Sequence, residues 1–480
     1  MSTKHSFDFA NVGKKNQRYS QADKRVVKSF ITDSEVILQR VQNLSKELSE
    51  QKKSLVKNLR RYRAALVPCH ILSDEILGYI FILASQIHGT VTLPFDSDNM
   101  PPQLTLSHVC SDWMHIARGT TELWNDIAVK CNDLREPVFR RWLLRAGTRP
   151  ISLELDFIDM TLPPISFVRT YLETQFRIEK LTLIQLGWEH LRPFREDDLP
   201  HLQELHLDLI VLRDDTTVPM VPLAQKIRSM KISGIFETDS ILEDPAVPWG
   251  NLRSFSWGTT PFLPLPSCMT LLRKMPQLEE CDLTIHDADH SDGKVIMTQV
   301  KTLTLNLLFT DANLVATSLI FPNLVSFSVR FGWSAGHPTQ IYEAFKKSYN
   351  FGRLRQLYLR GCRFSLGTIL NDAPELRDLS VSDAIVDDDV VEGLSTCRLG
   401  RFIISLRICG DVCVGEMLDM LEARHKLATR IIKNSTNCKD DVSIIRRATF
   451  CPSGRLRDPD LYEERADALE RLGIIVRFSN

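Results

Sequence analysis

No apolar run in this chain of 480 residues approaches the roughly 18 residues that a transmembrane helix needs. The longest near the start is Ile76 to Ala84, and the first residues are too polar for a secretory signal. The eleven cysteines lack repeated C-x-x-C spacing, so reduced thiols are expected rather than a disulfide framework. Together these absences predict no membrane association and a cytoplasmic or nuclear location.

Sequence motifs of common enzymes are also missing. The chain contains no G-x-S-x-G, G-x-x-x-x-G-K-S/T, G-x-G-x-x-G or H-E-x-x-H. The nearest imitation of a phosphate-binding loop, "GDVCVGEM" at 410, has Glu416 where the lysine would stand, and a carboxylate repels phosphate. We therefore expect a binding protein without catalytic residues or a cofactor, and not an enzyme.

Two short clusters contain residue types that bind metal ions. "HDADH" places His286 and His290 four residues apart around two aspartates, and "CGDVC" places Cys409 near Cys413. Neither cluster has a second set of ligands in the sequence, and such residues more often belong to polar loops or fill small spaces. No metal site is expected at either place.

Composition is that of a globular chain, with 43% hydrophobic and 25% charged residues and enough length for a large core. The net charge of −1 hides an asymmetry, because residues 1–66 carry +9 and the remainder −10. Residues 1–30 are polar and lysine-rich, so they are expected to form a disordered basic tail. The basic cluster Lys57, Arg60, Arg61 and Arg63 keeps contact with nucleic acid open as an alternative.

Apolar residues between 31 and 66 recur at alternating spacings of four and three, the period of a coiled-coil seam. The pattern predicts one helix over 31–66. Its seam fits either packing against the rest of the chain or self-association, and the polar Gln51 and Asn58 lower its stability. The seam positions are Ile37, Val41, Leu44, Leu48, Gln51, Leu55, Asn58, Tyr62 and Ala65.

Three short apolar helices are predicted over 68–130. "CHILSDEILGYIFILASQIHG" begins with Ser73 as its N-cap, and Gly89 offers a stop. After a proline-containing loop, "LTLSHVCSDWMHIARG" predicts a second helix around Trp113, and "TELWNDI" a third short one around Trp124. So small a unit cannot bury all of its large apolar side chains, so apolar surface for a partner is expected.

These segments resemble the F-box. "ILSDEILGYIF", "LSHVCSDWMHIA" and "LWNDI" follow its common form, with Leu-Pro before an acidic residue and Ile-Leu, then Val-Cys, a Trp four residues after the Val, and Leu-Trp. In this chain Ser73 replaces the usual Pro. The upstream coiled coil, the loop between the first two helices and the junction "RWLLRAGTRPISLEL" are similar to F-box-like proteins of mushroom-forming fungi.

The resemblance implies a partner, the small Skp-type adaptor of a cullin–RING ubiquitin ligase. It also implies that the first two helices supply the docking surface or its support. The residues expected there are Leu72, Glu75, Ile76, Leu77, Ile80, Phe81, Val109, Cys110, Trp113 and Ile116. The alternative is an ordinary helical lid over the domain that follows.

A linker helix is expected at 131–149, and segments of the form L-x-x-L-x-L recur through 150–480. They start at 178, 202, 227, 252, 278, 300, 324, 354, 376 and 399, in steps of 22 to 30 residues. Such steps are typical of leucine-rich repeats, which stack one strand per repeat into a curved parallel sheet. "PISLEL" at 150 is a further candidate strand, and a final helix, Gly473 and a last strand are expected to cap an irregular solenoid. The predicted fold class is α/β.

Side chains between the inward positions are expected on the concave face of that sheet. Their charges are mixed, with an acidic middle and a basic-aromatic patch at Arg330, Tyr358 and Arg360. Arginine and tyrosine are enriched at interface hot spots, which makes this patch, together with His206, the candidate for binding a substrate protein. For any single residue, a solvated polar sheet face is the plainer interpretation.

The most economical hypothesis is an adaptor of a Skp–cullin–F-box ubiquitin ligase. The F-box-like domain at 68–130 would hold the ligase core, and the repeats at 150–480 would hold the substrate. One alternative is a repeat scaffold that joins no ligase and oligomerises through the coiled coil. Another is a nucleic-acid-associated protein, for which binding should be salt-dependent and lost without residues 1–66.

Overall fold

The computed structural model shows an α/β protein whose strands form one long parallel sheet. The described residues are 19–65, 72–95, 100–132, 136–158, 177–186, 199–210, 226–235, 247–258, 263–287, 293–332, 338–434, 442–452 and 459–478. The chain divides into two compact units, Met1–Ile80 and Phe81–Asn480, and the division falls inside helix α2, Asp74–His88. Each unit is described by itself.

Unit 1 contains the long helix α1, Gln21–Ala65. The helix begins at Gln21 because Ser20 and Asp23 cap it reciprocally. The Ser20 hydroxyl accepts from the Asp23 N–H at 3.2 Å, and the Asp23 carboxylate accepts from the Ser20 N–H at 3.1 Å. The helix expected over 31–66 is therefore longer, and the prediction of disorder over 1–30 is wrong for residues 21–30. Residues 1–18 lie outside the described residues.

The segment predicted as one helix around Trp113 is two helices, α3 at Pro102–Ser107 and α4 at Ser111–Gly119. His108 ends α3, and Cys110 adopts an extended backbone as the N-cap of α4. Apolar spacing continues across this break, which is why the sequence pattern did not reveal it. A short 3-10 helix, η3 at Thr121–Trp124, follows as predicted, and the linker helix at 131–149 is α5, Glu136–Ala146.

Every strand pair in the long sheet is parallel, and the strands follow the chain in order, except that β14 lies off this path and pairs with β15. The described sheet has 16 strands. They are β1 Val91–Leu93, β2 Asp126–Lys130, β3 Ile151–Asp156, β4 Ile178–Leu186, β5 Glu204–Ile210, β6 Ser229–Ile235, β7 Ser254–Trp257, β8 Glu280–His286, β10 Thr302–Leu308, β12 Ser326–Phe331, β13 Gln356–Arg360, β14 Phe364–Ser365, β15 Asp378–Ile385, β16 Ser405–Asp411, β17 Arg447–Pro452 and β18 Ile475–Phe478. Strands β9 Val295–Ile296 and β11 Leu319–Ile320 form a separate pair.

The sheet starts earlier than expected. Its first strands, β1 and β2, come from 68–130, the segment predicted to be an independent helical domain, and β2 pairs directly with β3. The boundary expected near 150 therefore lies within continuous backbone pairing. The sequence hid this because β1 has only three residues and β2 follows η3 without a turn signal.

The repeat spacing located most strands accurately. From β5 to β15, each predicted segment places its strand two residues after the segment start. The segment at 399 is the exception, because the chain turns at Gly400 with a positive φ and β16 begins only at Ser405. Strand β17 was not predicted, since small Ala448 occupies one of its two buried positions and weakens the pattern. The final helix α14, Pro459–Glu470, the positive φ of Gly473 and strand β18 are confirmed.

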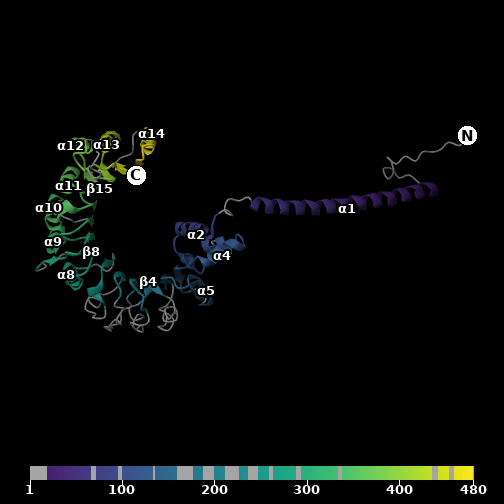
Figure 1. The fold of residues 1–480 in the computed structure, drawn as a ribbon, viewed down its shortest axis with the longest axis horizontal. Helices are drawn as coiled ribbons and strands as arrows, with labels where there is room; N and C mark the ends of the chain where they lie inside the picture. Colours follow the sequence, from purple (N-terminus) through teal and green to yellow (C-terminus); the bar gives the residue numbers. More distant parts are fainter. Residues whose placement is uncertain are drawn as a thin grey trace. The chain divides into compact units, whose positions relative to one another are not determined.

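Where the connecting residues are described, most successive strands are joined by at least one helix, and the arrangement is compatible with a solenoid. Figure 1 shows α8 to α12 along the outer side of the curved sheet, with β8 and β15 on the inner side. Inward leucines, phenylalanines and isoleucines of the strands meet these helices; Phe327 of β12, for example, packs edge-on against Tyr349 with ring centroids 5.1 Å apart. The remaining helices are α8 Leu265–Lys274, α9 Ala312–Ser318, α10 Pro338–Tyr349, α11 Leu366–Asp372, α12 Asp388–Ser395, α13 Val414–Asn434, and the 3-10 turns η6 Trp249–Asn251 and η7 Phe351–Arg353.

Candidate docking and binding surfaces

Helix α2 carries the first group of predicted docking residues. Ser73 precedes it, and the Ser73 carbonyl accepts from the Leu77 N–H at 3.0 Å. A hydrogen bond from the Ser73 side chain lowers the pKa of Glu75, which stands with Asp74 in the first turn, where negative charge complements the helix dipole. Serine therefore starts this helix without the proline usual in the F-box.

Four large aliphatic side chains form an exposed row along α2. Their helical spacing places them on one side of the helix. Ile76 is 50% exposed and Ile87 is 84% exposed, whereas Leu77 and Phe81 are buried. The row, called the α2 stripe below, consists of Ile76, Ile80, Leu83 and Ile87.

The structure separates the predicted docking residues into core and surface. Leu77, Phe81 and Ile116 are buried, and Phe81 packs against the half-buried Trp113 with ring centroids 4.9 Å apart. The exposed ones are Leu72, Glu75, Ile76, Ile80, Val109 and Cys110. Sequence reasoning missed Leu83 and Ile87, although their spacing from Ile80 was an available signal.

The tryptophans of this region contribute to the packing between its helices. Cys110 caps α4 by accepting from the Trp113 N–H at 3.5 Å. Trp124 is fully buried, and its indole N–H donates to the Ala117 carbonyl at 2.8 Å. Its ring meets Trp142 of α5 edge to face at 4.9 Å, so Trp124 fastens η3 between α4 and α5.

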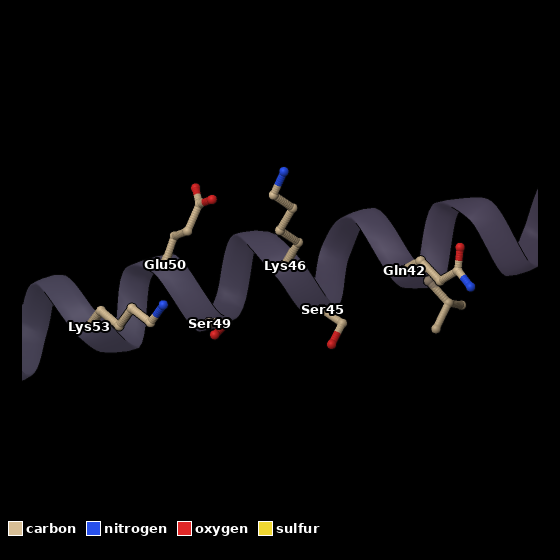
Figure 2. Close-up of a pocket in the computed structure, with 7 residues that line it drawn as sticks. Gln42, Ser45, Lys46, Ser49, Glu50 and Lys53 are labelled. Carbon is tan, nitrogen blue, oxygen red and sulfur yellow. The ribbon is translucent and has the colours of Figure 1, made fainter.

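The large apolar seam residues of α1 are all exposed. A shallow groove on α1 is lined by Val41 and by polar side chains of the same helix, of which Figure 2 labels Gln42, Ser45, Lys46, Ser49, Glu50 and Lys53. One helix cannot enclose a ligand, so this groove is the polar border of a seam and not a small-molecule site. The exposed seam residues are Ile37, Val41, Leu44, Leu48, Leu55 and Tyr62.

We expect α1 to associate with a second copy of itself. Leu44→Lys/Leu48→Lys should convert the oligomer to a monomer, because it places two charges in an apolar seam. Light scattering after size-exclusion chromatography measures the mass, with Lys46→Gln, a polar position outside the predicted seam, as the control. A monomeric wild type would contradict the prediction.

The second candidate surface is the sheet face whose side chains stay mostly part-exposed, called the open face below. Alternate residues of each strand point to it, and parallel pairing aligns them in rows across the sheet. One row, in register from β4 to β18, consists of Thr182, His206, Lys231, Ser256, Asp282, Thr304, Ser328, Tyr358, Ser380, Arg407, Thr449 and Arg477.

Charge separates along the open face into an acidic half and a basic half. In the acidic half, β2 to β8 carry Asp126, Glu154, Asp156, Glu204, Asp208, Glu280 and Asp282 beside Lys130, Lys180 and Lys231. In the basic half, β10 to β18 carry Arg330, Arg360, Arg407, Arg447 and Arg477 beside Asp378. Burial, with the neighbouring carboxylates Asp156 and Asp126, raises the pKa of Glu154, as expected where carboxylates crowd together.

His206 does not belong to the predicted basic-aromatic patch. Five strands separate β5 from β13, which corresponds to about 29 Å of sheet at about 4.8 Å per step. The His206 Nε2 atom lies 3.4 Å from the Ser233 hydroxyl, which donates to Asp208 at 3.2 Å. Burial and nearby Lys231 lower the pKa of His206, so its imidazole is neutral at pH 7 within a local polar network.

The other three predicted substrate-binding residues do come together. Arg330 and Arg360 are register partners on β12 and β13, and Tyr358 lies two residues before Arg360 on the same face. Like charges side by side on a sheet repel, so this pair favours an anion. Tyr358 also borders a hollow that continues across the last strands of the sheet.

That hollow, called the arginine groove below, has a volume of about 380 Å³. Sequence reasoning missed its three arginines, Arg407, Arg447 and Arg477. Their signal was one arginine in each of the last three strands, but β17 was not predicted and β16 begins later than its predicted segment, so the three arginines could not be aligned. The groove is lined by Tyr358, Asp378, Leu379, Ser380, Ser405, Arg407, Arg447, Ala448, Thr449, Ile475 and Arg477.

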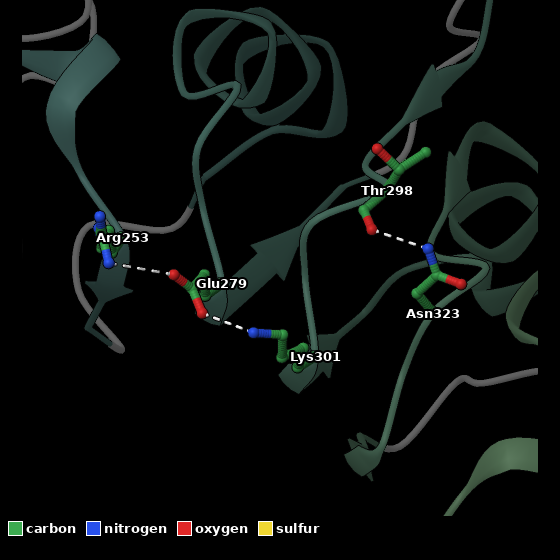
Figure 3. Close-up of polar contacts among 5 residues, drawn as sticks. All are labelled: Arg253, Glu279, Thr298, Lys301 and Asn323. Atoms are coloured by element: carbon green, nitrogen blue, oxygen red, sulfur yellow. Dashed lines mark hydrogen bonds and ion pairs between the residues drawn. The ribbon is translucent and has the colours of Figure 1, made fainter.

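A different polar ladder lies just before the strands. Figure 3 shows Glu279 between Arg253, at 3.6 Å, and Lys301, at 2.8 Å, with Asn323 donating to the Thr298 carbonyl at 2.9 Å. Lys301 lowers the pKa of Glu279 through their hydrogen bond and charge. These charges satisfy one another between neighbouring repeats, so the ladder is structural.

Within the described residues, no group of three or more His, Cys, Asp or Glu side chains could hold a metal ion. The ring of His286 meets Phe309 edge to face with centroids 5.7 Å apart, and the other histidine of that cluster, His290, lies outside the described residues. Cys409 is the register partner of Cys451, and Cys413 lies after the end of β16.

No family model matches the chain, and no curated protein is significantly similar to it. Among the described residues, every helix is too short or too polar to cross a bilayer. Functional inference for this protein therefore depends on its own surfaces: the α2 stripe, the seam of α1 and the open face.

Proposed function

We propose that this chain is the substrate-recognition adaptor of a Skp–cullin–F-box type ubiquitin ligase. The F-box-like segment, with the α2 stripe, would dock to the Skp-type adaptor, and the leucine-rich-repeat-like sheet would hold the substrate on its open face. The exposed α2 stripe is the observation that carries the proposal. The resemblance of "ILSDEILGYIF" and "LSHVCSDWMHIA" to the F-box supports it.

Exposure of the stripe has a physical cost that a partner would remove. Four aliphatic side chains on one side of a 15-residue helix remain in water in the free chain. Burying such a side chain in an interface contributes about 1.5–3 kcal/mol each before the costs of association. A continuous apolar row of this kind is typical of helices that dock into a groove.

The proposed role requires no chemistry from this chain. Holding a substrate beside the ubiquitin donor raises the effective concentration of its lysines, and rate follows from proximity and orientation. The open face suits that task because its side chains are polar, partly exposed and fixed by strand register.

Co-purification with a recombinant fungal Skp-type adaptor tests the proposal. The wild type is expected to form a stoichiometric complex, and Ile76→Asp/Ile80→Asp to bind at least about a hundredfold more weakly, because a carboxylate in an apolar contact costs several kcal/mol. Both positions are exposed in the free chain, so the variant should fold. Leu77→Asp would be uninformative because Leu77 is buried.

The control is Leu144→Asp, which puts a carboxylate on an apolar residue of α5 that is also exposed. It should bind as the wild type does, and circular dichroism should show all three proteins folded. A folded wild type that forms no complex, or a double variant that binds as tightly, would refute docking through the stripe.

A second candidate function is a scaffold that oligomerises through α1 and joins no ligase. The exposed apolar seam of α1 is the observation that favours it. A wild type that oligomerises through α1 but binds no Skp-type adaptor would make the scaffold the better account.

A further inference from the structure

The arginine groove collects positive charge on three consecutive strands. Arg407 comes from β16, Arg447 from β17 and Arg477 from β18, the last strand of the sheet. All three side chains are exposed, and within the described residues only Arg447 is near a carboxylate, Asp378 at 3.7 Å. The groove therefore contains more guanidinium groups than carboxylates that could neutralise them.

Strand register arranges the three arginines around one hydroxyl group. Thr449 has Arg407 as its register partner on one side and Arg477 on the other. Arg447 lies two residues earlier on the strand of Thr449 and on the same face. The backbones of Arg407 and Arg477 thus lie about one strand spacing, roughly 4.8 Å, on either side of Thr449, and all three arginines line the same hollow as Thr449.

Two thiols interact with one of these groups. Hydrogen bonds with Cys409 and Cys451 raise the pKa of Arg407, and an arginine stays charged in any case. Tyr358 and Ser380 continue the same row away from Arg407. They add an exposed aromatic ring and a hydroxyl beside the cationic centre.

We propose that the arginine groove binds a phosphorylated side chain of an extended substrate peptide. Several guanidinium groups with hydroxyl donors suit a phosphate dianion, whose oxygens accept several charge-assisted hydrogen bonds at once. A single carboxylate has fewer acceptor sites and half the charge. The inference rests on the proposed function and names its substrate class.

The remainder of the open face selects a peptide over a nucleic acid. A polyanion lying along the sheet would leave the arginine groove and meet the carboxylates of the acidic half, from Asp282 back to Asp126. A peptide carries its phosphate at one position and can place neutral or basic residues over the acidic half. Arg330 and Arg360, between the two regions, would then meet residues next to the phosphate.

The test uses the full chain without any ligase component. A fluorescent degenerate peptide library with one fixed phosphoserine, and matched libraries with serine or glutamate at that position, are titrated by fluorescence anisotropy in buffered salt. We expect the phosphoserine library to bind at least about tenfold more tightly than either, since each charge-assisted contact is strong.

Two triple variants make the result specific. Arg407→Gln/Arg447→Gln/Arg477→Gln should abolish the preference for phosphoserine. Lys130→Gln/Lys180→Gln/Lys231→Gln removes the same charge from exposed residues of the acidic half and should retain the preference. Equal binding of the phosphoserine and serine libraries, equal loss in both variants, or competition by a single-stranded oligonucleotide as strong as by phosphopeptide would overturn the proposal.

The result is separable from adaptor docking, because no library contact involves α2. If the chain selects phosphopeptides but binds no Skp-type adaptor, the groove proposal stands and the ligase proposal is refuted. If the chain docks to the adaptor but shows no phosphoserine preference, the ligase proposal stands and the proposal of a phosphate site in the groove is refuted.

Discussion

Arg424→Met is expected to lower the free energy of unfolding by about 4 kcal/mol, the cost of breaking a buried, hydrogen-bonded charge. Arg424 lies on α13 and is 1% exposed. Its guanidinium donates to backbone carbonyls and to no carboxylate among the described residues. The acceptors are Leu394 at 3.0 Å, Leu399 at 3.3 Å, Gly400 at 2.7 Å, Arg401 at 3.1 Å and Ser443 at 3.4 Å.

The effect should be large because three of these carbonyls, those of Leu399, Gly400 and Arg401, belong to the turn that feeds β16, and the other two belong to α12 and to the segment before β17. Gly400 and Arg401 also accept backbone N–H groups, at 3.1 and 3.0 Å, but Arg424 is the donor that reaches Leu399. Burial lowers the pKa of Arg424, yet arginine remains charged, so it cannot relieve the desolvation by losing its proton. Methionine fills similar space without any donor.

Chemical denaturation followed by circular dichroism measures the change, and hydrogen exchange locates it. Protection should fall first over 394–411 and 443–452. Arg430→Met, on the exposed side of the same helix, should change stability by less than about 0.5 kcal/mol. If the two variants unfold alike, the carbonyl contacts of Arg424 are not what holds this turn.

Trp124→Ala should destabilise unit 2 by about 4 kcal/mol, within the range for a large buried aromatic side chain. The ring is fully buried, meets Trp142 at 4.9 Å and carries the Arg145 guanidinium over its face at 4.6 Å. The alanine variant also leaves the Ala117 carbonyl without the indole donor. Trp124→Phe keeps much of the volume but not the donor, so about half of that loss is expected.

Thermal and urea unfolding of both variants check this order, with Leu144→Ala as an exposed control on α5. The Phe variant should fall between wild type and the Ala variant. Equal stability of Trp124→Ala and Leu144→Ala would show that η3 is not fixed by its tryptophan. Trp124→Ala leaves the side chains of the α2 stripe unchanged, so any loss of binding to the Skp-type adaptor by this variant would result from partial unfolding.

Much of the fold could be predicted from the sequence because repeated apolar residues record strand positions directly. The spacing of "LQELHL", "LEECDL" and "LRQLYL" located β5, β8 and β13, since two faces of a strand alternate with period two. The pattern failed where backbone conformation, and not apolar spacing, determines where an element begins or ends. Gly400 turns the chain away before β16, and Cys110 breaks a run whose apolar spacing continues through it.

The candidate sites were predictable only in part, since exposure depends on distant packing. Residue type was enough to name α2 as a candidate docking helix and Arg330 and Arg360 as a candidate binding pair. It could not show that Leu77 and Phe81 are buried while Ile76 and Ile80 are exposed. The arginine groove exists only because β16, β17 and β18 pair in register, and no local pattern encodes that proximity.

The continuous pairing from β1 through β3 limits how such a protein could be rearranged. Strands β1 and β2 close one edge of the sheet, although they are encoded inside the segment that resembles the F-box. Cutting the chain near residue 150 would expose the backbone N–H and C=O groups of β3 as a sticky edge. Exchange of the helical segment as an independent unit would therefore also remove the two strands that cover the edge of β3.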